Sequence, residues 1–203
     1  MLRMDSKRAG LALVLGAAVI MTACKKNDSG GADTGLVNDT GMVAVTDTGT
    51  AAPPAALSDA NIVYILDNAN MLDSAAGSIA ATKGTSADVR DFGKTMMREH
   101  HSLRKQEEDL AKKLGVTREA PANDDGKRSY DKTMSMLNGA AKGKDFDKAY
   151  IDNEVRYHQA VLQTATTAMG AAQYAELKNL IQKAAPALQT HLDRAKSIQA
   201  KMK

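Results

Sequence analysis

The chain contains no tryptophan, and aromatic residues make up only 3% of its 203 positions. Proteins that bind single-stranded nucleic acids stack the bases on exposed aromatic rings. So few rings argue against a stacking surface for bases or sugars. Apolar residues nevertheless account for 43% of the chain. A core built from Ala, Leu, Ile, Val and Met favours closely packed helices.

The chain also lacks a dominant charge. Lys and Arg number 27 against 24 Asp and Glu, the net charge is +3, and the two signs are interspersed. Nucleic-acid-binding domains concentrate their basic residues in a patch or stripe. The composition therefore argues against a nucleic-acid partner.

Cysteine occurs only once, at Cys24, and it follows a segment with the layout of a secretory signal. Basic residues come first, and residues 9–23 then form an uncharged apolar run that is short for a membrane-spanning helix. The run ends in "MTAC", which resembles the lipobox of bacterial lipoproteins, although Met21 replaces the usual aliphatic residue. Residues 1–23 are therefore predicted to be a lipoprotein signal peptide.

The lipobox resemblance implies cleavage before Cys24, lipid attachment to its sulfur, and an exported protein anchored to the membrane. An uncleaved membrane anchor is the alternative interpretation. Lys25 stands where an aspartate would resemble an inner-membrane retention signal. We therefore expect the outer membrane, facing the periplasm, if the cell is Gram-negative. A lipidated Cys24 leaves no thiol for a disulfide or a catalytic nucleophile.

Residues 24–57 carry no helical period and are rich in Gly, Thr, Asp and Ala. This composition predicts a flexible linker that follows the lipidated cysteine. The triplet Asp-Thr-Gly occurs at 33–35, 39–41 and 47–49. Aspartic proteases carry this triplet on a loop between strands, but no strand pattern flanks it here. Low-complexity repetition is the interpretation we favour.

Residues 58–203 are long enough for one domain with a core, and apolar residues recur there in steps of three and four. No window alternates like a strand. The pattern predicts an all-α, four-helix bundle with a short accessory helix in the crossover. Capping residues and glycine breaks predict two helices in the first half, from Ser58 to Gly84 and from Thr85 or Ser86 to Leu114. A short helix is predicted within 127–139. Two further long helices run from near Asp145 to Gly170 and from about Tyr174 onward, the last with a kink at Pro186.

Three of the four histidines interrupt an apolar stripe, each on a different predicted helix: His100, His158 and His191. His101 lies about 100° around the helix from His100 and has mostly charged neighbours. We therefore expect His101 in solvent and the other three inside the bundle.

Acidic residues share these stripes. Asp73 faces inward from the first helix, Glu107 takes a stripe position on the second, and Glu154 lies one turn before His158. Helical bundles build metal sites from such inward-facing groups. The candidate ligands of a transition metal, for which zinc, iron and copper are the options, are Asp73, His100, Glu154, His158 and His191.

The alternative is a structural network of separate pairs, Asp73 with His100 and Glu154 with His158. A common site requires all three histidines at one level. Counted from a break near 170, His191 lies farther out than His158, by on the order of 10 Å. A turn nearer Gln173 would reduce this offset, so both hypotheses stay open.

Three segments, "DFGKTMMREHHSLRKQEEDLAKKLG", "DFDKAYIDNEVRYHQAVLQ" and "LQTHLDRAKSI", resemble the bacterial family called domain of unknown function 4142. The resemblance covers about residues 59–200. The motif histidines fall on His100, His158 and His191, and an "FD..Y" motif falls on 146–150. The resemblance implies a ferritin-like fold, export and an outer-membrane location. It implies no particular activity.

Ferritin-like di-iron proteins carry Glu-x-x-His on two helices. Here the residues three positions before the motif histidines are Met97, Val155 and Leu188. The di-iron motif is absent, so a metal site would be mononuclear and rich in histidine. Methionine sulfur is an option for copper, but methionines at helical spacing are more typical of core packing.

The sequence thus leaves three functions open. The first is a lipid-anchored, non-enzymatic envelope protein whose interior histidines bind a metal or small ligand, or sense pH. The second is a structural or stress-related interaction module of the envelope. The third is a metal-dependent oxidoreductase. No protein partner is predicted.

Overall fold

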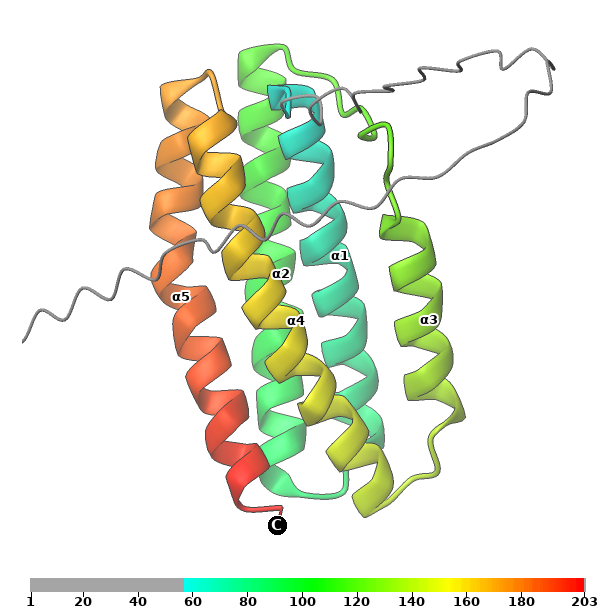
Figure 1. Ribbon diagram of the computed structural model, residues 1–203. Helices are drawn as coiled ribbons and strands as arrows, with labels where there is room; N and C mark the ends of the chain where they lie inside the picture. The colour runs from blue at the N-terminus through cyan, green and yellow to red at the C-terminus, as the bar shows by residue number, and fades with distance from the viewer. Residues whose placement is uncertain (1–56, 203) are drawn as a thin grey trace, which may run out of the picture. The chain divides into compact units, whose positions relative to one another are not determined.

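The computed structural model describes residues 57–202. This part of the chain consists of helices without strands: α1 Asp59–Lys83, α2 Ala87–Leu114, α3 Gly126–Gly139, α4 Lys144–Ala171 and α5 Ala175–Ala200. The four long helices run side by side as a bundle, and α3 lies along its outside next to α1 (Figure 1). The predicted all-α bundle with an accessory helix is confirmed for this domain. The predicted signal peptide, Cys24 and the linker as far as 56 lie outside the described residues.

Capping residues set the helix boundaries where the sequence predicts them. Ser58 forms a reciprocal capping box with Asn61 at the start of α1. The Ser86 side chain accepts a hydrogen bond from the Val89 backbone at the start of α2. Gly115 ends α2 in the left-handed conformation, at φ 67°, which glycine adopts at no steric cost. None of the described helices combines the length and apolar character needed to span a membrane.

The boundary between the last two helices lies close to the prediction. Helix α4 ends at Ala171, directly after Gly170, and the turn occupies 172–174. A glycine inside a helix costs only about 1 kcal/mol, which the packing of α4 offsets. The apolar period also predicts Met169 and Tyr174 on the inner faces, but they are 38% and 40% exposed, so this part of the prediction was wrong. Helix α5 runs through Pro186, where the kink stays a prediction.

Helices α1 and α2 approach each other at a pair of glycines. A Cβ placed on Gly77 would lie 2.6 Å from the Gly93 carbonyl oxygen, and one on Gly93 would lie 2.8 Å from the Ala81 nitrogen. No side chain fits at either position without separating the helices. This contact lies one turn from Asp73 and two turns from His100, so it fixes the spacing of those residues.

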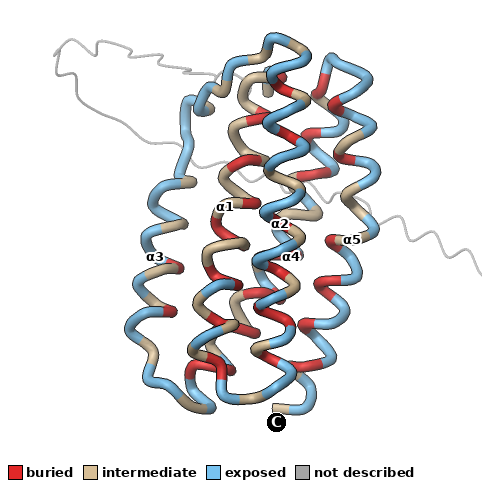
Figure 2. The backbone as a smooth tube through the Cα atoms, turned by 180° about the vertical axis from the view of Figure 1, so that it is seen from behind, coloured by how far each residue is buried: buried red, intermediate tan, exposed pale blue. Residues whose placement is uncertain are grey.

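The core has two parts. Its buried positions recur along each long helix, where they are red in Figure 2. We call the first the aromatic cluster, because it contains Phe92, Phe146 and Tyr150 among its 13 buried members. We call the second the aliphatic cluster, which consists of Ile62, Val63, Ala111, Ala165, Ala168, Ala172, Leu177 and Ile181. Along the helices, the three interior histidines and Asp73 lie between the two clusters.

The "FD..Y" motif has a structural role. Phe146 and Tyr150 stack with ring centroids 6.4 Å apart. The Asp147 carboxylate accepts hydrogen bonds from the Thr85 backbone and hydroxyl and from the Ser86 backbone, at 2.6–2.8 Å. Asp147 therefore ties the start of α4 to the turn between α1 and α2.

Candidate metal centre

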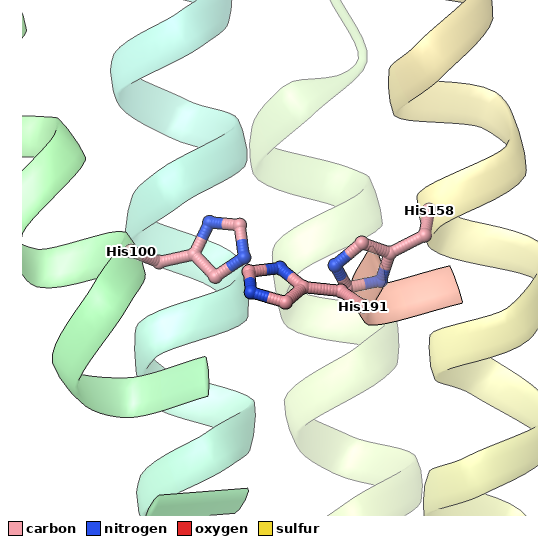
Figure 3. A group of neighbouring side chains, drawn as sticks. All are labelled: His100, His158 and His191. Atoms are coloured by element: carbon pink, nitrogen blue, oxygen red, sulfur yellow. The ribbon is translucent and has the colours of Figure 1, made fainter. Parts of the chain in front are cut away.

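Three histidines from three helices converge in the middle of the bundle (Figure 3). Their ring centroids are 5.2–5.6 Å apart. One ring nitrogen each from His100, His158 and His191 lies within 4.8 Å of the others. Of the two alternatives for His191, the structure shows the turn near Gln173, at 172–174, which brings His191 level with the other two histidines. His101 is exposed, as predicted.

Asp73 joins this group from α1. Its Oδ2 lies 3.1 Å from His100 Nε2 and 3.4 Å from His158 Nε2. Only 1% of the residue is exposed. The predicted pairing of Asp73 with His100 is present, but the carboxylate is shared with His158. The two histidines therefore do not have separate acidic partners.

Glu154 lies beside the same group. One ligand atom each from Asp73, Glu154 and His158 falls within a 4.8 Å cluster, and Glu154 Oε2 is 3.6 Å from His158 Nδ1. Burial raises the pKa of Glu154 well above its usual value, and the Asp73 carboxylate raises it further. Glu154 is therefore a neutral acid beside Asp73 at neutral pH.

Burial and neighbouring charges also shift the pKa values of Asp73, His100 and His191. Burial opposes ionisation of Asp73, but His100, His158 and His191 and a hydrogen bond from Glu154 lower its pKa overall. Burial lowers the pKa of His100, and of His191 despite its carboxylate partner. Asp73, His100 and His191 therefore titrate as one interacting group.

Asn70 fixes the tautomer of His100. The amide nitrogen of Asn70 donates to the Leu66 carbonyl at 3.0 Å and to Glu107 Oε1 at 2.7 Å. The amide oxygen therefore faces His100 Nδ1, at 2.7 Å. Because an amide oxygen only accepts, Nδ1 carries the hydrogen and Nε2 presents a lone pair.

The other two histidines are held in the same way. His158 Nδ1 donates to the Glu154 backbone carbonyl at 3.1 Å. His191 Nε2 donates to Glu99 Oε2 at 2.8 Å. Partial burial opposes ionisation of Glu99, but hydrogen bonds from His191 and Arg98 lower its pKa overall, so it accepts as a carboxylate. The free lone pairs are therefore on His158 Nε2 and His191 Nδ1 in the neutral rings.

These three lone-pair nitrogens are buried and have no hydrogen-bond partner among residues 57–202, and neither does Asp73 Oδ1. The nitrogens of His100 and His158 approach Asp73 Oδ2 without hydrogen-bond geometry. Lone pairs that converge on a carboxylate repel each other unless a positive charge lies between them. Histidines that bind metals are held in this arrangement, with the outer nitrogen donating to an oxygen.

A family model described as a domain of unknown function (DUF4142) matches residues 44–198. The chain belongs to this family. No curated protein and no solved structure matches it. The DUF4142 resemblance in the sequence is thus confirmed. The ferritin-like fold and the export that it implies stay predictions.

In this DUF4142 chain, sequence reasoning missed two residues that hold the histidines. Asn70 lies three residues before Asp73, so it shares the inner face of α1, and this spacing was a usable signal. Glu99 precedes His100 directly and so points elsewhere on α2; only the packing of α5 reveals its contact with His191. Glu107, a predicted stripe residue, is buried beyond Asn70, and burial raises its pKa to about 8.

The prediction of core packing is confirmed for Met96 in this DUF4142 chain and is wrong for Met97. Met96 is fully buried in the aromatic cluster. Met97 is 38% exposed. The groups that converge at the centre are therefore nitrogen and oxygen donors.

Proposed function

We propose that the bundle binds one transition-metal ion through His100, His158, His191 and Asp73. The strongest support is that His100, His158 and His191 each offer a ring nitrogen within 4.8 Å of the others. The Asp73 carboxylate lies 3.1–3.4 Å from two of these rings, those of His100 and His158. Nitrogen and carboxylate ligands suit zinc, iron or copper. The proposed site is mononuclear because the Glu-x-x-His motif of di-iron bundles is absent.

The second layer of contacts also supports metal binding. Each histidine donates its outer N–H to an oxygen: Asn70 Oδ1, the Glu154 backbone carbonyl or the Glu99 carboxylate. Such contacts orient the rings before an ion arrives. They also prevent the outer nitrogens from competing as ligands.

We further propose that this is a lipid-anchored protein of the cell envelope that binds its metal without catalysing a reaction. The support lies in the sequence: an apolar run at 9–23, a lipobox-like "MTAC" and a polar linker before the bundle. Lys25 favours the outer membrane, facing the periplasm, in a Gram-negative cell. No nucleophile with an adjacent base, of the kind that covalent catalysis needs, emerges among the residues described.

The test is metal binding by the full chain after treatment with a chelator. We expect calorimetric titration with Zn²⁺, Co²⁺ or Cu²⁺ to give one ion per chain and the unfolding temperature to rise. His158→Ala should abolish both effects. His101→Ala is the matched control, because His101 is exposed and adjacent in sequence to a proposed ligand. Absence of stoichiometric binding and of a thermal shift in the wild-type chain would remove the proposal.

A structural role for the histidines is the second candidate. Asp73 lies within 3.4 Å of two ring nitrogens, so a proton on one imidazole would also satisfy the carboxylate. In that case added metal would leave the unfolding temperature unchanged.

A further inference from the structure

A cavity of about 30 Å³ adjoins the proposed centre on the side of the aliphatic cluster. Asp73 and His100 line one end, Glu107 lines it as well, and apolar side chains from all four long helices form the walls. None of the lining residues is classed as exposed. By this measure one water-sized atom needs about 10–15 Å³, so the cavity has room for about two to three.

Small side chains line the cavity from α1, α4 and α5. Ala69, Ala165 and Ala184 line it. Protein interiors are normally packed with few voids larger than a water molecule. A void against the candidate ligands Asp73 and His100 therefore gives a bound metal an open coordination position. Metal sites that bind exogenous molecules keep such a position, whereas structural sites are closed.

The charges of the centre indicate what kind of ligand fits. A divalent ion, one Asp73 carboxylate and neutral imidazoles leave a net charge of about +1. This count follows from the ligands alone, because a histidine binds a metal as the neutral imidazole and an aspartate as the carboxylate. An uncompensated charge in an apolar interior is costly. A ligand with one negative charge would neutralise the centre.

Glu107 adds a hydrogen-bond donor to the same cavity. Its Oε1 accepts from Asn70 at 2.7 Å, while Oε2 is buried and has no partner in the described part of the chain. Since burial raises the pKa of Glu107 to about 8, Oε2 carries a proton at neutral pH. An unpartnered O–H in the wall favours an acceptor inside the cavity.

A surface groove provides a route from solvent. It has a volume of about 310 Å³ and is lined by Glu99, Lys183 and His191 among residues of α2 and α5. The groove and the cavity share three lining residues, Leu103, Leu180 and Ala184. These side chains separate solvent from the cavity. Lys183 and the Glu99 carboxylate put one charge of each sign at the mouth, so the mouth does not repel a small anion.

We propose that the metal centre binds a small monovalent anion of one to three atoms in this cavity, as a ligand exchangeable with solvent. This inference rests on the metal binding proposed above. The metal would then bind an external ligand, in addition to holding the helices together. The size of the cavity excludes larger organic acids.

The test uses the full chain loaded with stoichiometric Co²⁺, whose visible absorption reports the number and kind of ligands. Sodium azide is the probe, with sodium sulfate matched for ionic strength as the blank, because sulfate is divalent and has five heavy atoms. We expect azide to change the spectrum in a saturable way. If Co²⁺ binds and saturating azide leaves the spectrum unchanged, the inference is wrong and the proposed metal site stands. If Co²⁺ does not bind, the proposed function itself fails.

Two variants locate the azide. Ala184→Leu adds three heavy atoms to the cavity, and we expect it to weaken azide binding by about tenfold or more while Co²⁺ still binds. Ala187→Leu is the matched control, because Ala187 lines the groove and not the cavity. Ala184→Val replaces the leucine variant if that one does not fold. Equal azide affinity in the wild type and the Ala184 variants would overturn the assignment to the cavity.

Discussion

The two sides of the proposed centre are packed differently. On one side, Phe92, Phe146 and Tyr150 are fully buried, and the Gly77–Gly93 contact holds α1 against α2. On the other side, alanines and leucines surround a cavity next to a surface groove. The comparison indicates a division of roles. The aromatic side fixes the helices that carry the ligands, and the aliphatic side leaves room for a ligand to enter.

Tyr150 shows where the aromatic side meets the centre. Its hydroxyl is buried without a hydrogen-bond partner among residues 57–202. Burial raises its pKa well above the usual value. The aromatic side therefore presents a neutral O–H group to the centre, from Tyr150.

Among substitutions on the two sides, Gly93→Ala should cause the largest loss of stability, because it disturbs the aromatic side. A Cβ at this position would lie 2.8 Å from two backbone atoms of α1, so the helices must separate. We expect a loss of about 3 kcal/mol in the free energy of unfolding and weaker metal binding. Chemical denaturation measures the first and calorimetry the second.

Gly139→Ala is the control for that substitution, because a Cβ there meets no atom within 4 Å. It should leave both quantities nearly unchanged. Equal stability of the two variants would mean that the glycine contact does not fix the aromatic side.

A second effect concerns the cavity wall and depends on pH. The folded-state pKa of Glu107 is about 8, against an ordinary value of 4.5. A raised folded-state pKa contributes stability that is fully present below pH 4.5 and is lost as pH rises through 8. Glu107→Gln should therefore be more stable than the wild type at pH 9, by about 2–4 kcal/mol, with little advantage at pH 4. Urea denaturation at both pH values checks this, and parallel pH profiles for the two proteins would contradict it.

A smaller effect is expected at the end of the aromatic side. Asp147→Ala removes three hydrogen bonds to the turn that starts α2. We expect a loss of about 1–2 kcal/mol in the free energy of unfolding, since the helix loses part of its cap. Metal affinity should change little, because the cap lies four turns from His100. A large loss of metal affinity would show that the two sides are not separable.

The smallest effect concerns the contacts that orient the rings. Asn70→Ala and Glu99→Ala each remove the acceptor of an outer histidine N–H. We expect metal affinity to fall by about tenfold in each variant while binding stays stoichiometric. Competition titrations against a chromophoric chelator measure this. If both variants bind the metal as tightly as the wild type, the hydrogen bonds of the outer N–H groups do not orient the rings for metal binding.

Much of the fold follows from the sequence because local signals set it. Ser58, Ser86 and Gly115 stop or start helices through their own side chains or backbone freedom. The period of apolar residues then determines which faces meet. The predicted end of α4, Gly170, falls just short of the observed end at Ala171. A single glycine does not stop a helix whose neighbouring residues still pack.

The candidate site could be predicted only in part. Asp73, His100, His158 and His191 stood out because polar residues interrupted apolar stripes. Their convergence depends on the turn at 172–174 and on the closeness of α1 and α2 at Gly77. Neither the role of Glu99 nor the cavity beside Glu107 has a local signal, because both arise from packing between helices.

X-ray absorption of the zinc-loaded full chain tests the proposed centre most directly, because it counts the ligands and identifies their atoms. The structure predicts one zinc per chain with three imidazole nitrogens and at least one oxygen, all at about 2.0–2.2 Å. A His158→Ala sample should lose this spectrum, and a His101→Ala sample should keep it. Fewer than three imidazoles in the wild-type spectrum, or a spectrum unaffected by His158→Ala, would contradict a metal centre at this place in the bundle.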